Sequence, residues 1–478
     1  FNIYEMSAWS RAIVVPLSMI WALKPHCPVA PWAGIEELRV QGTRLPRRRG
    51  AWASFFLGVD AGLKVAERAR IRPFRRLAMQ RAEAWILQRL EASDGLGAIF
   101  PPIINTIIAF RALGRAPDDP ILVSQIHALE KLEIEEGETL RVRPCFCPVW
   151  DTALALNALV ESGVAADDPR LCQAARWLMR REVRRPGDWQ VKCPGTAAGG
   201  WYFEYANEFY PDCDDTAQAV TSLSKVALAV GDIGQRDRQT VRAIRWLLAM
   251  QSRNGGWASF DRDCDRELLT AIPFADHNAM IDPPTVDVTA RVLEALTQAG
   301  LSLASPAVRR GVAFLLAEQE PDGSWFGRWG CNYLYGTWLA LSALQRAGED
   351  LRAPWARKAR EWLLSCQNAD GGWGELPSSY SDPRLKGQGP STASQTAWAL
   401  AGVIAAGAAN SIAARRGVRY LLDHQQADGG WRDAFWTGTG FPKVFYLKYH
   451  LYATYFPLHA LARWLRAQGI PDTGELEP

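Results

Sequence analysis

Hydrophobic residues recur with the period of an α-helix along most of the chain, and alternating runs typical of strands are too short to be useful. Residues 1–25 predict one helix, and residues 51–66 predict a second helix with an apolar face. From residue 82 onward, the pattern predicts successive helices joined by loops that contain Gly, Pro and Asp. We therefore expect an all-α protein.

A repeat is superimposed on this helical pattern. Four segments share one spacing, in which an aromatic residue is followed by a Gln five residues later and a Trp six residues after that. They are Trp246–Gln251–Trp257, Phe314–Gln319–Trp325, Trp362–Gln367–Trp373 and Tyr420–Gln425–Trp431. A degraded copy ends at Trp189, with Glu182 in place of the Gln, and a weaker copy around Trp85 to Ile99 lacks the Trp.

Helix pairs that recur in this way predict a stacked or ring-closed helical array. The four copies begin 68, 48 and 58 residues apart, which leaves room for two helices and their loops. Because the spacings are irregular and no polar capping repeat is evident, we expect a closed α/α barrel rather than an open solenoid. We also expect each Gln to bond orphan carbonyl groups of a neighbouring helix, with the Trp packed over its amide.

Charge and cysteine content exclude several classes of partner. Lys and Arg (54) nearly balance Asp and Glu (51), so the net charge of +3 predicts no nucleic-acid partner. The nine cysteines form no C-x-x-C pair, and Cys145 and Cys147 have no nearby His, so reduced thiols are expected rather than a zinc site. Asp261, Asp263 and Asp265 alternate as in a calcium loop but lack its Gly and terminal Glu, so no metal is predicted.

Two apolar stretches bear on membranes. The run from Ala12 to Leu23 is too short to span a bilayer. Residues 51–66 are followed by basic residues from Arg68 to Arg76, a combination that suits a membrane interface. An ordinary packed helix explains residues 51–66 equally well.

The most unusual stretch is residues 199–217, where six aromatic residues run directly into three carboxylates. The carboxylates are Asp212, Asp214 and Asp215. Their mutual repulsion raises the pKa of at least one of them, while the positive end of the following helix lowers carboxylate pKa values. The residues alone leave open which acid keeps its proton. The alternative is a solvated acidic helix cap.

Taken together, these motifs resemble those of the squalene–hopene cyclases, a family of triterpene cyclases. The Gln–Gly-x-Trp repeats are similar to the QW motifs of this family, and residues 212–217 resemble its Asp-x-Asp-Asp-Thr-Ala region. Residues 327–336 and 437–442 resemble further family segments. The related oxidosqualene cyclases carry Asp-Cys-Thr-Ala-Glu, which this sequence lacks.

The resemblance implies a fold and a location. The fold would be two α/α barrels of the α6–α6 type around an apolar cavity. Residues 1–146 would be the remaining part of the first barrel, and residues 147–478 the catalytic barrel. Because the chain opens on Phe1, without Met and within a helical pattern, we expect a missing N-terminal portion and an incomplete first barrel. The protein would be a monotopic homodimer on the cytoplasmic side of a bacterial cell membrane.

The resemblance also implies an activity, the acid-initiated cyclisation of squalene to hopene, hopanol or both, without a cofactor. Protonating an isolated alkene requires a strong acid in an apolar site, where desolvation keeps a carboxyl group neutral until it delivers its proton. Asp214 would be that acid, with Asp212 and Asp215 as polarising neighbours.

Arg291 departs from the family pattern. Family members often carry a His four residues after an Asp, whereas this chain has Asp287 and then Arg291. A guanidinium can stabilise the carboxylate left behind, but it cannot shuttle a proton. Return of the proton to Asp214 would then require water or Tyr335. A structural salt bridge between Arg291 and Asp287, one turn apart, is the alternative role.

Aromatic side chains would stabilise the carbocations, because their faces attract cations without offering a reactive lone pair. By motif match, the pocket-lining residues would be Trp9, Trp150, Phe203, Phe260, Phe274, Trp329, Phe441, Phe445, Tyr449 and Tyr452. Phe274 and His277 would line a substrate channel. Plain core packing is the alternative for any one of these aromatic residues.

Other functions compete with this interpretation. A class II cyclase of another polyprenoid shares the Asp-x-Asp-Asp acid but binds a diphosphate. An α/α-barrel glycoside hydrolase would combine stacked aromatics with two carboxylates. A protein-prenyltransferase-like barrel would need an Asp/Cys/His zinc set, and a non-enzymatic helical scaffold would not place an acid cluster at an enclosed apolar cavity.

Overall fold

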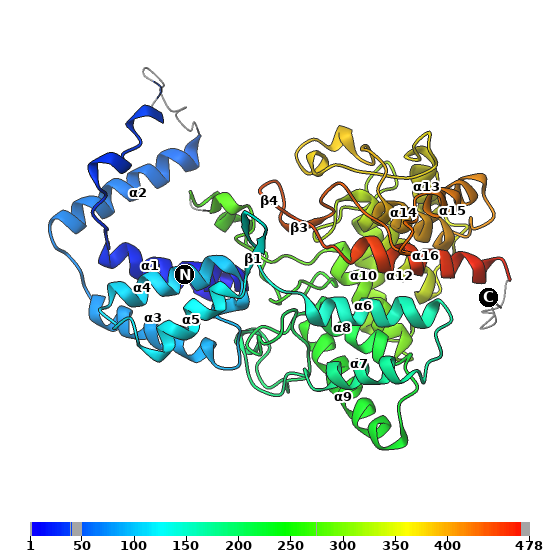
Figure 1. Cartoon of the computed structure of the whole chain (residues 1–478), viewed down its shortest axis with the longest axis horizontal. Helices are drawn as coiled ribbons and strands as arrows, with labels where there is room; N and C mark the ends of the chain where they lie inside the picture. Colours follow the sequence, from blue (N-terminus) through cyan, green and yellow to red (C-terminus); the bar gives the residue numbers. More distant parts are fainter. Residues whose placement is uncertain (1, 39, 41–49, 274, 470–478) are drawn as a thin grey trace. The chain divides into compact units, whose positions relative to one another are not determined.

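The computed structural model describes residues 2–38, 40, 50–273 and 275–469, and it shows a mostly helical chain (Figure 1). Its α-helices are α1 (Ala8–Leu23), α2 (Ala51–Arg68), α3 (Arg75–Leu90), α4 (Phe100–Ala112), α5 (Pro120–Glu130), α6 (Pro148–Glu161), α7 (Pro169–Met179), α8 (Cys213–Leu223), α9 (Val230–Met250), α10 (Val286–Gln298), α11 (Pro306–Ala317), α12 (Tyr333–Ala347), α13 (Pro354–Ser365), α14 (Ala393–Ala405), α15 (Ile412–Asp423) and α16 (Tyr452–Ala467). The prediction of a mainly helical protein is confirmed.

Two short antiparallel hairpins qualify the all-α prediction. Strand β1 (Glu133–Glu136) pairs with β2 (Thr139–Val142), with Glu133 opposite Val142. Strand β3 (Gly438–Phe441) pairs with β4 (Phe445–Leu447), and the register shifts between Thr439 and Phe441. Strands of three or four residues fall below the length at which alternating hydrophobicity can be recognised in a sequence.

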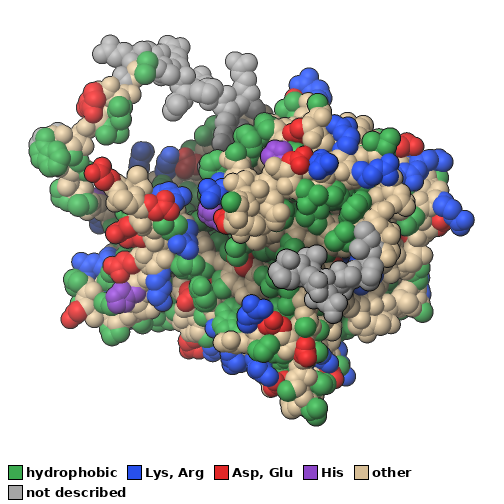
Figure 2. Space-filling view, turned by 45° about the vertical axis from the view of Figure 1, so that its right-hand side comes forward, with side chains coloured by type: hydrophobic (Ala, Val, Ile, Leu, Met, Phe, Trp, Pro, Cys, Tyr) green, Lys and Arg blue, Asp and Glu red, His purple; other side chains and the backbone are tan. Residues whose placement is uncertain are grey.

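The chain divides into two compact units. The ring unit comprises Phe1–Ala8, Phe146–Asp265 and His277–Pro478, and the second unit comprises Trp9–Cys145 and Arg266–Asp276. On the face shown in Figure 2, Lys and Arg side chains are interspersed with Asp and Glu side chains rather than gathered in one field.

The second unit contains α1 to α5 and the first hairpin. Helices α1 and α2 cover most of the two N-terminal stretches predicted to be helical. Several large apolar side chains of α2 are exposed, namely Trp52, Phe55, Leu57, Val59, Leu63 and Val65. Among the described residues, no helix combines the length and the apolar character needed to cross a membrane.

Six helices of the ring unit contact one another in a closed order. Helix α6 contacts α8, contacts continue through α10, α12 and α14 to α16, and α16 returns to α6. The intervening helices α7, α11 and α13 contact the ring helices on both sides of them in the sequence, and α9 and α15 contact the ring helices that precede them, α8 and α14. Every residue of α8 is buried, as expected for a helix surrounded by others on all sides.

The glutamines of the repeat connect successive helices. The amide of Gln251 donates to the carbonyl of Gly255 at 2.8 Å and to that of Ala307, in the first turn of α11, at 2.9 Å. Gln319 and Gln367 make the same pair of bonds, the second one reaching the first turn of α13 or α15. The predicted contact to a neighbouring helix is therefore present. Its acceptor, however, lies in the first turn of that helix and is not an orphan carbonyl of a helix end.

The tryptophans of the repeat satisfy the orphan carbonyls instead. The indole N–H of Trp257 donates to the carbonyl of Leu247, in the last turn of α9, at 2.7 Å. Equivalent bonds, all spanning ten residues, join Trp325 to Leu315, Trp373 to Leu363 and Trp431 to Leu421. Since the last carbonyls of a helix have no partner within the helix, each indole caps the helix that precedes it.

The degraded copy of the repeat does not end where the sequence predicted. Trp201, rather than Trp189, donates to the last-turn carbonyl of Leu178 in α7, at 2.8 Å. The indole nitrogen of Trp189 is buried without a hydrogen-bond partner. Glu182 binds Gln239 and Arg242 of α9. Extra residues between Glu182 and Trp201 lengthen the spacing of this copy, so the spacing rule did not identify Trp201.

Candidate active site

The acidic stretch is a modified copy of the repeat. Trp201 forms an isolated bridge with Asp212, just as Trp257 does with Thr285 and Trp373 with Thr392. Asp212, Thr285 and Thr392 are the N-cap residues of α8, α10 and α14. The repeat therefore fixes the first turn of α8, and with it the position of Asp214.

Asp212 is used as the cap of α8. Its side chain accepts the backbone N–H of Asp215 at 2.7 Å, and its backbone is extended, as N-cap residues usually are. Burial raises the pKa of Asp212 to about 6, although the hydrogen bonds from Asp215 oppose this shift. Burial, the nearby charge of Asp212 and a hydrogen bond between the two carboxyl groups raise the pKa of Asp215 well above its usual value.

Asp214 has a different partner. Its Oδ1 lies 3.1 Å from Nε of Arg291, and their side chains are 12% and 2% exposed. Burial raises the pKa of Asp214 well above its usual value, and the Arg291 charge only partly opposes this effect. The solvated helix cap considered from the sequence is therefore excluded, because all three carboxyl groups are buried.

Arg291 is a fixed cation on α10. Its Nη2 donates to the hydroxyl of Tyr335 at 2.9 Å. Burial alone would lower the pKa of Arg291, but Tyr335 and Asp214 outweigh burial and raise it. The guanidinium therefore stays charged beside the acid.

The alternative role of Arg291, a salt bridge to Asp287, is not what the structure shows. The carboxylate of Asp287 accepts the backbone N–H groups of Arg328 and Trp329 at 2.8 and 2.7 Å, and that of Val288 at 3.1 Å. Asp287 thus holds the loop that carries Trp329, and Arg291 pairs with Asp214. The ability of a carboxylate to accept several backbone amides explains this choice.

Aromatic rings surround the acid pair. The Arg291 guanidinium lies 4.9 Å from the ring centroid of Trp150 and 5.7 Å from those of Tyr335 and Trp338. The Trp150 indole donates to the hydroxyl of Tyr452 at 3.0 Å.

The aromatic assembly continues away from Arg291. Phe203 lies 6.4 Å from Trp150 and 6.3 Å from Tyr449, and Tyr449 stacks on Tyr452 at 4.4 Å. Four of the predicted pocket residues, Trp150, Phe203, Tyr449 and Tyr452, therefore form one assembly at the acid.

The structure places the other predicted aromatics elsewhere. Phe441 contacts Phe445 at 6.2 Å on the second hairpin, where His277 packs on Phe441 at 5.3 Å and Phe445 is 40% exposed. Phe260 packs against a small cluster formed by Ala8, Phe209 and Tyr210. Trp329 lies under the guanidinium of Arg328 at 4.2 Å. Trp9 is buried in α1 of the second unit, and Phe274 lies outside the described residues.

Three aromatic residues at the site were missed from the sequence. Trp338 follows Tyr335 on α12, Trp398 lies on α14, and Phe456 lies on α16. Trp398 lies 4.8 Å from Tyr335 and 5.5 Å from Phe456, and all of them are buried. Large aromatics within Ala-rich, uniformly buried helices are the signal that could have identified them.

The acid pair sits at one end of the ring. First-turn residues of α6, α8, α10, α12 and α16 meet there, namely Trp150, Asp214, Asp287, Tyr335 and Tyr452. Residues from the middle and C-terminal halves of α6, α8, α10 and α12, together with residues of α16 between Tyr455 and Arg463, line a cavity of about 30 Å³, which is room for a water molecule. Arg291 lines this cavity and also contacts Asp214.

This arrangement is suited to donating a proton in an apolar setting. A raised pKa favours the protonated form of a buried carboxyl group, and an adjacent permanent cation stabilises the carboxylate formed when the proton leaves. The surrounding rings can stabilise a positive charge on the acceptor. In the described part of the chain, no group of three or more His, Cys, Asp or Glu residues is placed to hold a metal ion.

Comparisons with known proteins bear on this chemistry. The family model described as the squalene–hopene cyclase C-terminal domain matches residues 146–466, and the one described as the N-terminal domain matches residues 1–138. The squalene–hopene cyclase of Alicyclobacillus acidocaldarius is 46% identical over 471 residues, which cover 98% of this chain and 74% of that protein.

Two further relatives show the breadth of the similarity. The squalene–hopene cyclase of Bradyrhizobium diazoefficiens is 43% identical over 477 residues, covering 97% of this chain and 72% of that protein. The dammaradiene synthase of Dryopteris crassirhizoma is 39% identical over 493 residues, covering 97% of this chain and 71% of that protein.

Proposed function

The chain belongs to the squalene–hopene cyclase family, and from this membership and the geometry of the acid site we propose that it cyclises squalene to a pentacyclic hopanoid. The product is hopene if the final cation loses a proton, and hopanol if it captures water. The observation that carries the proposal is the buried Asp214–Arg291 pair within a continuous aromatic assembly.

In the proposed first step, Asp214 donates its proton to a terminal alkene of squalene. The C=C π electrons form the new C–H bond, the O–H electrons stay on Asp214, and a tertiary cation remains on the substrate. Burial supports this role because it raises the pKa of Asp214 and so favours the protonated form of its carboxyl group. Asp212 and Asp215 are the proposed polarising neighbours of Asp214, and Asp212 also caps the first turn of α8.

Arg291 stabilises the carboxylate that forms on Asp214. A guanidinium does not release its proton near neutral pH, so it cannot return one to the acid. Water or the Tyr335 hydroxyl, which accepts from Arg291, is the proposed source of the returning proton. Asp287 contributes by holding the loop that carries Trp329.

The aromatic assembly stabilises the cations that migrate along the substrate. Trp150, Phe203, Tyr449 and Tyr452 lie at the acid and are proposed to contact the first ring that forms. The remaining motif-matched residues are proposed to contact other parts of the substrate: Trp9, Phe260, Phe274, Trp329, Phe441 and Phe445.

The proposed architecture follows from the helix contacts. The closed order of α6, α8, α10, α12, α14 and α16 supports an α6–α6 barrel with QW repeats in residues 147–478, the proposed catalytic domain. Residues 1–146 are proposed to belong to a first α/α barrel. The match of separate N- and C-terminal family models to these two parts supports the division.

We further propose that the protein is monotopic, lies on the cytoplasmic side of a bacterial membrane and forms a homodimer. The exposed Trp52, Phe55 and Leu63 of α2 support insertion into a membrane interface. Sedimentation with anionic vesicles tests membrane binding, and light scattering in detergent tests the dimer. Loss of vesicle binding in a Trp52→Ser, Phe55→Ser variant is the expected result.

The function is tested by incubating detergent-solubilised protein with squalene and identifying the products by gas chromatography and mass spectrometry. Asp214→Asn is expected to lower turnover by at least about 100-fold, since it removes the general acid. Asp168→Asn is the matched control, because Asp168 caps α7 away from the site and Asn caps equally well. Full turnover by Asp214→Asn would exclude Asp214 as the acid.

A second candidate is a class II cyclase that acts on another polyprenoid or makes another skeleton. The 39% identity to a protein named dammaradiene synthase is the observation that favours this second candidate function. Parallel incubations with squalene and with geranylgeranyl diphosphate separate the two functions. Conversion of the diphosphate alone would replace squalene as the proposed substrate, and a tetracyclic product from squalene would replace hopanoids as the proposed product.

A further inference from the structure

We propose that Trp338 is a positioning residue that holds the Arg291 guanidinium on Asp214. The proposal deepens the proposed function and rests on it wherever cyclisation is the readout. Trp338 does not itself contact the acid; it acts through Arg291. Three observations support this role: the geometry around the guanidinium, the packing behind the Trp338 ring, and the cavity into which Arg291 could otherwise turn.

Few directed bonds fix the guanidinium. Nε of Arg291 lies 3.1 Å from Asp214, but neither that nitrogen nor Oδ1 of Asp214 has a hydrogen bond of good geometry. The bond from Nη2 to Tyr335 is directed. The ring of Trp338 lies 5.7 Å from the guanidinium carbon. In a desolvated site such a cation–π contact contributes as much as a hydrogen bond, so the aromatic faces decide where the charge rests.

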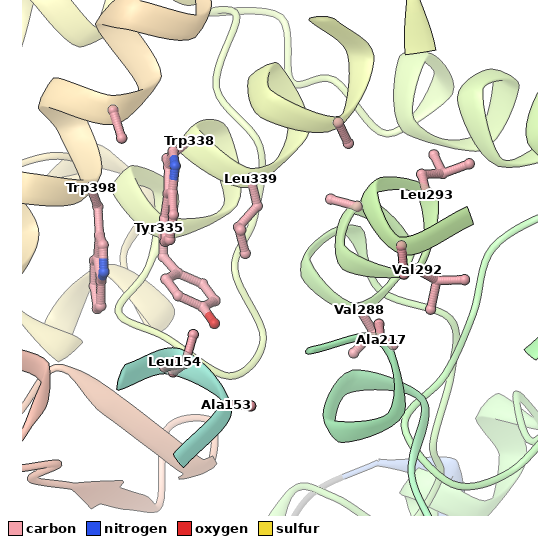
Figure 3. Packing of buried hydrophobic residues seen from close by; sticks show 14 of the residues in the cluster. Ala153, Leu154, Ala217, Val288, Val292, Leu293, Tyr335, Trp338, Leu339 and Trp398 are labelled. Carbon is pink, nitrogen blue, oxygen red and sulfur yellow. The ribbon is translucent and has the colours of Figure 1, made fainter. Parts of the chain in front are cut away.

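The Trp338 ring is itself immobilised. It lies parallel to the ring of Trp398 on α14, at 6.2 Å and an interplanar angle of 7°, and Phe456 of α16 packs edge-on against it at 5.5 Å. Figure 3 shows Trp338 and Trp398 face to face, with Tyr335 beside them. Trp338 is 4% exposed and Trp398 is fully buried. A ring packed from three helices can therefore serve as a rigid support.

On the side away from Asp214, Arg291 borders a cavity that is also lined by a second carboxylate, that of Glu294. The cavity toward the C-terminal ends of the ring helices is lined by Trp338 and Arg291 and also by Asn157, Gln218 and Glu294. Glu294 lies on the same helix as Arg291, three residues further on, within reach of an i,i+3 ion pair. Without the Trp338 ring, the bond to the Tyr335 hydroxyl and the face of Trp150 are the remaining contacts described above that oppose a turn of Arg291 from Asp214 toward Glu294. Trp338 thus selects between two carboxylates.

Other charged and titratable groups also face this region, and each belongs to a packed element. Asp214 lies on α8, Asp287 on α10, Tyr335 on α12, and Tyr452 and Tyr455 on α16. The charged groups that line the cavity are Lys225, Glu294, Arg346, His459 and Arg463. None of these side chains is altered in the variants below, so a change in the pH profile reports the placement of Arg291.

The test compares Trp338→Leu with Trp398→Leu. Both changes remove one ring of the same stacked pair, but only Trp338 faces Arg291. Activity of a general acid falls as pH rises through its pKa. Loss of the adjacent cation raises that pKa, so the falling limb of kcat against pH is expected to move up by about one unit in Trp338→Leu. A smaller movement is expected in Trp398→Leu, which removes one support of the Trp338 ring but leaves that ring beside Arg291, and little movement is expected in the conservative Trp338→Phe.

Coupling is tested in a double-variant cycle. In an Arg291→Gln background, Trp338→Leu is expected to cause no further shift, because residues that act through one another are not additive. An equal limb shift in Trp398→Leu would overturn the proposal. A shift to lower pH in Trp338→Leu would also overturn it, since that would mean that Trp338 only keeps water away from the acid.

A readout without turnover separates this proposal from the proposed function. In a crystal structure of Trp338→Leu, Arg291 is expected to have left Asp214, whereas in Trp398→Leu it is expected to stay. Retention of the Arg291–Asp214 contact in both variants would overturn the role of Trp338 even if squalene is cyclised. Failure of the unaltered protein to cyclise squalene would overturn the proposed function. The crystal structures of the variants would then decide the proposed role of Trp338.

Discussion

At the scale of single residues, environment gives three neighbouring carboxyl groups three different roles. Asp212 caps α8, Asp215 bonds to Asp212, and Asp214 faces Arg291. The sequence indicates that their pKa values must separate, because like charges repel. It could not indicate which acid pairs with a cation, because that cation lies 77 residues further on and its helix is placed by tertiary packing.

Tyr335 provides a prediction at this scale. Tyr335→Phe removes the hydroxyl that accepts from Arg291, leaving a buried charged donor without this partner. A bond to a charged group contributes about 1.5–3 kcal/mol, so kcat is expected to fall by about 10- to 100-fold. KM for squalene is expected to stay constant, because the ring that the substrate meets is retained.

Steady-state kinetics on squalene measure this effect. Tyr420→Phe is the control, since Tyr420 belongs to the repeat on α15 and its ring stacks on His424 away from the acid. An unchanged kcat in Tyr335→Phe would exclude the hydroxyl both as a support for Arg291 and as a source of the returning proton.

At the scale of elements, each copy of the repeat joins the end of one helix to the start of the next through hydrogen bonds. The sequence predicts the four complete copies because their spacing is constant. For the degraded copy the sequence indicates Trp189, whereas the Trp that bonds to α7 is Trp201, because extra residues separate it from Glu182. Constant spacing is readable in a single sequence, whereas a hydrogen bond across an insertion becomes visible only in three dimensions.

The two tryptophans give a matched pair for measurement. Trp201→Phe removes the indole donor to the Leu178 carbonyl, which keeps its bond from the Arg181 N–H, so one net hydrogen bond is lost, at a cost of about 0.5–1.5 kcal/mol beyond the lost volume. Trp189→Phe removes a similar volume but no hydrogen bond. Urea midpoints at constant m-value are expected to be lower for Trp201→Phe. Equal midpoints would show that the indole bond contributes nothing to stability.

At the scale of the whole ring unit, closure depends on contacts between α6 and α16. Glu161, at the end of α6, binds Lys225, His459 at 2.8 Å and Arg463 at 3.0 Å. The helical period and the repeat predict a ring of helices, but neither indicates this cluster. Its members are up to 302 residues apart, and each would be taken for an ordinary surface charge.

Glu161→Gln is expected to destabilise the ring unit strongly. Removing one partner of a buried ion pair costs about 3–5 kcal/mol, because the cations left behind are desolvated and uncompensated. Asp232→Asn is the control: its partner Arg176 is 43% exposed, and such a surface pair contributes little to stability because water screens it. Chemical denaturation of both variants at neutral pH measures the difference. Similar losses would mean that the cluster does not hold the ring closed.

The same residue predicts a pH dependence. Burial alone would raise the pKa of Glu161, but His459, Arg463 and Lys225 outweigh burial and hold it well below the usual value of 4.5. The unfolded chain therefore binds more protons than the folded one below pH 4.5, and stability from this group is lost as pH falls. The difference in unfolding free energy between the unaltered protein and Glu161→Gln is expected to be constant above pH 7, where His459 is neutral in both, and to shrink below pH 4.5.

The closed helix order also sets when the acid site can exist during synthesis. Trp150 on α6 bonds to Tyr452 on α16, 302 residues later. At about 5–20 residues per second, a ribosome needs roughly 15–60 s to make the chain between them. During that interval, the faces of α6 and α14 that contact α16 have no partner in the nascent chain. The reactive pocket is therefore assembled only after α16 has emerged, and the unfinished ring must be protected from aggregation until then.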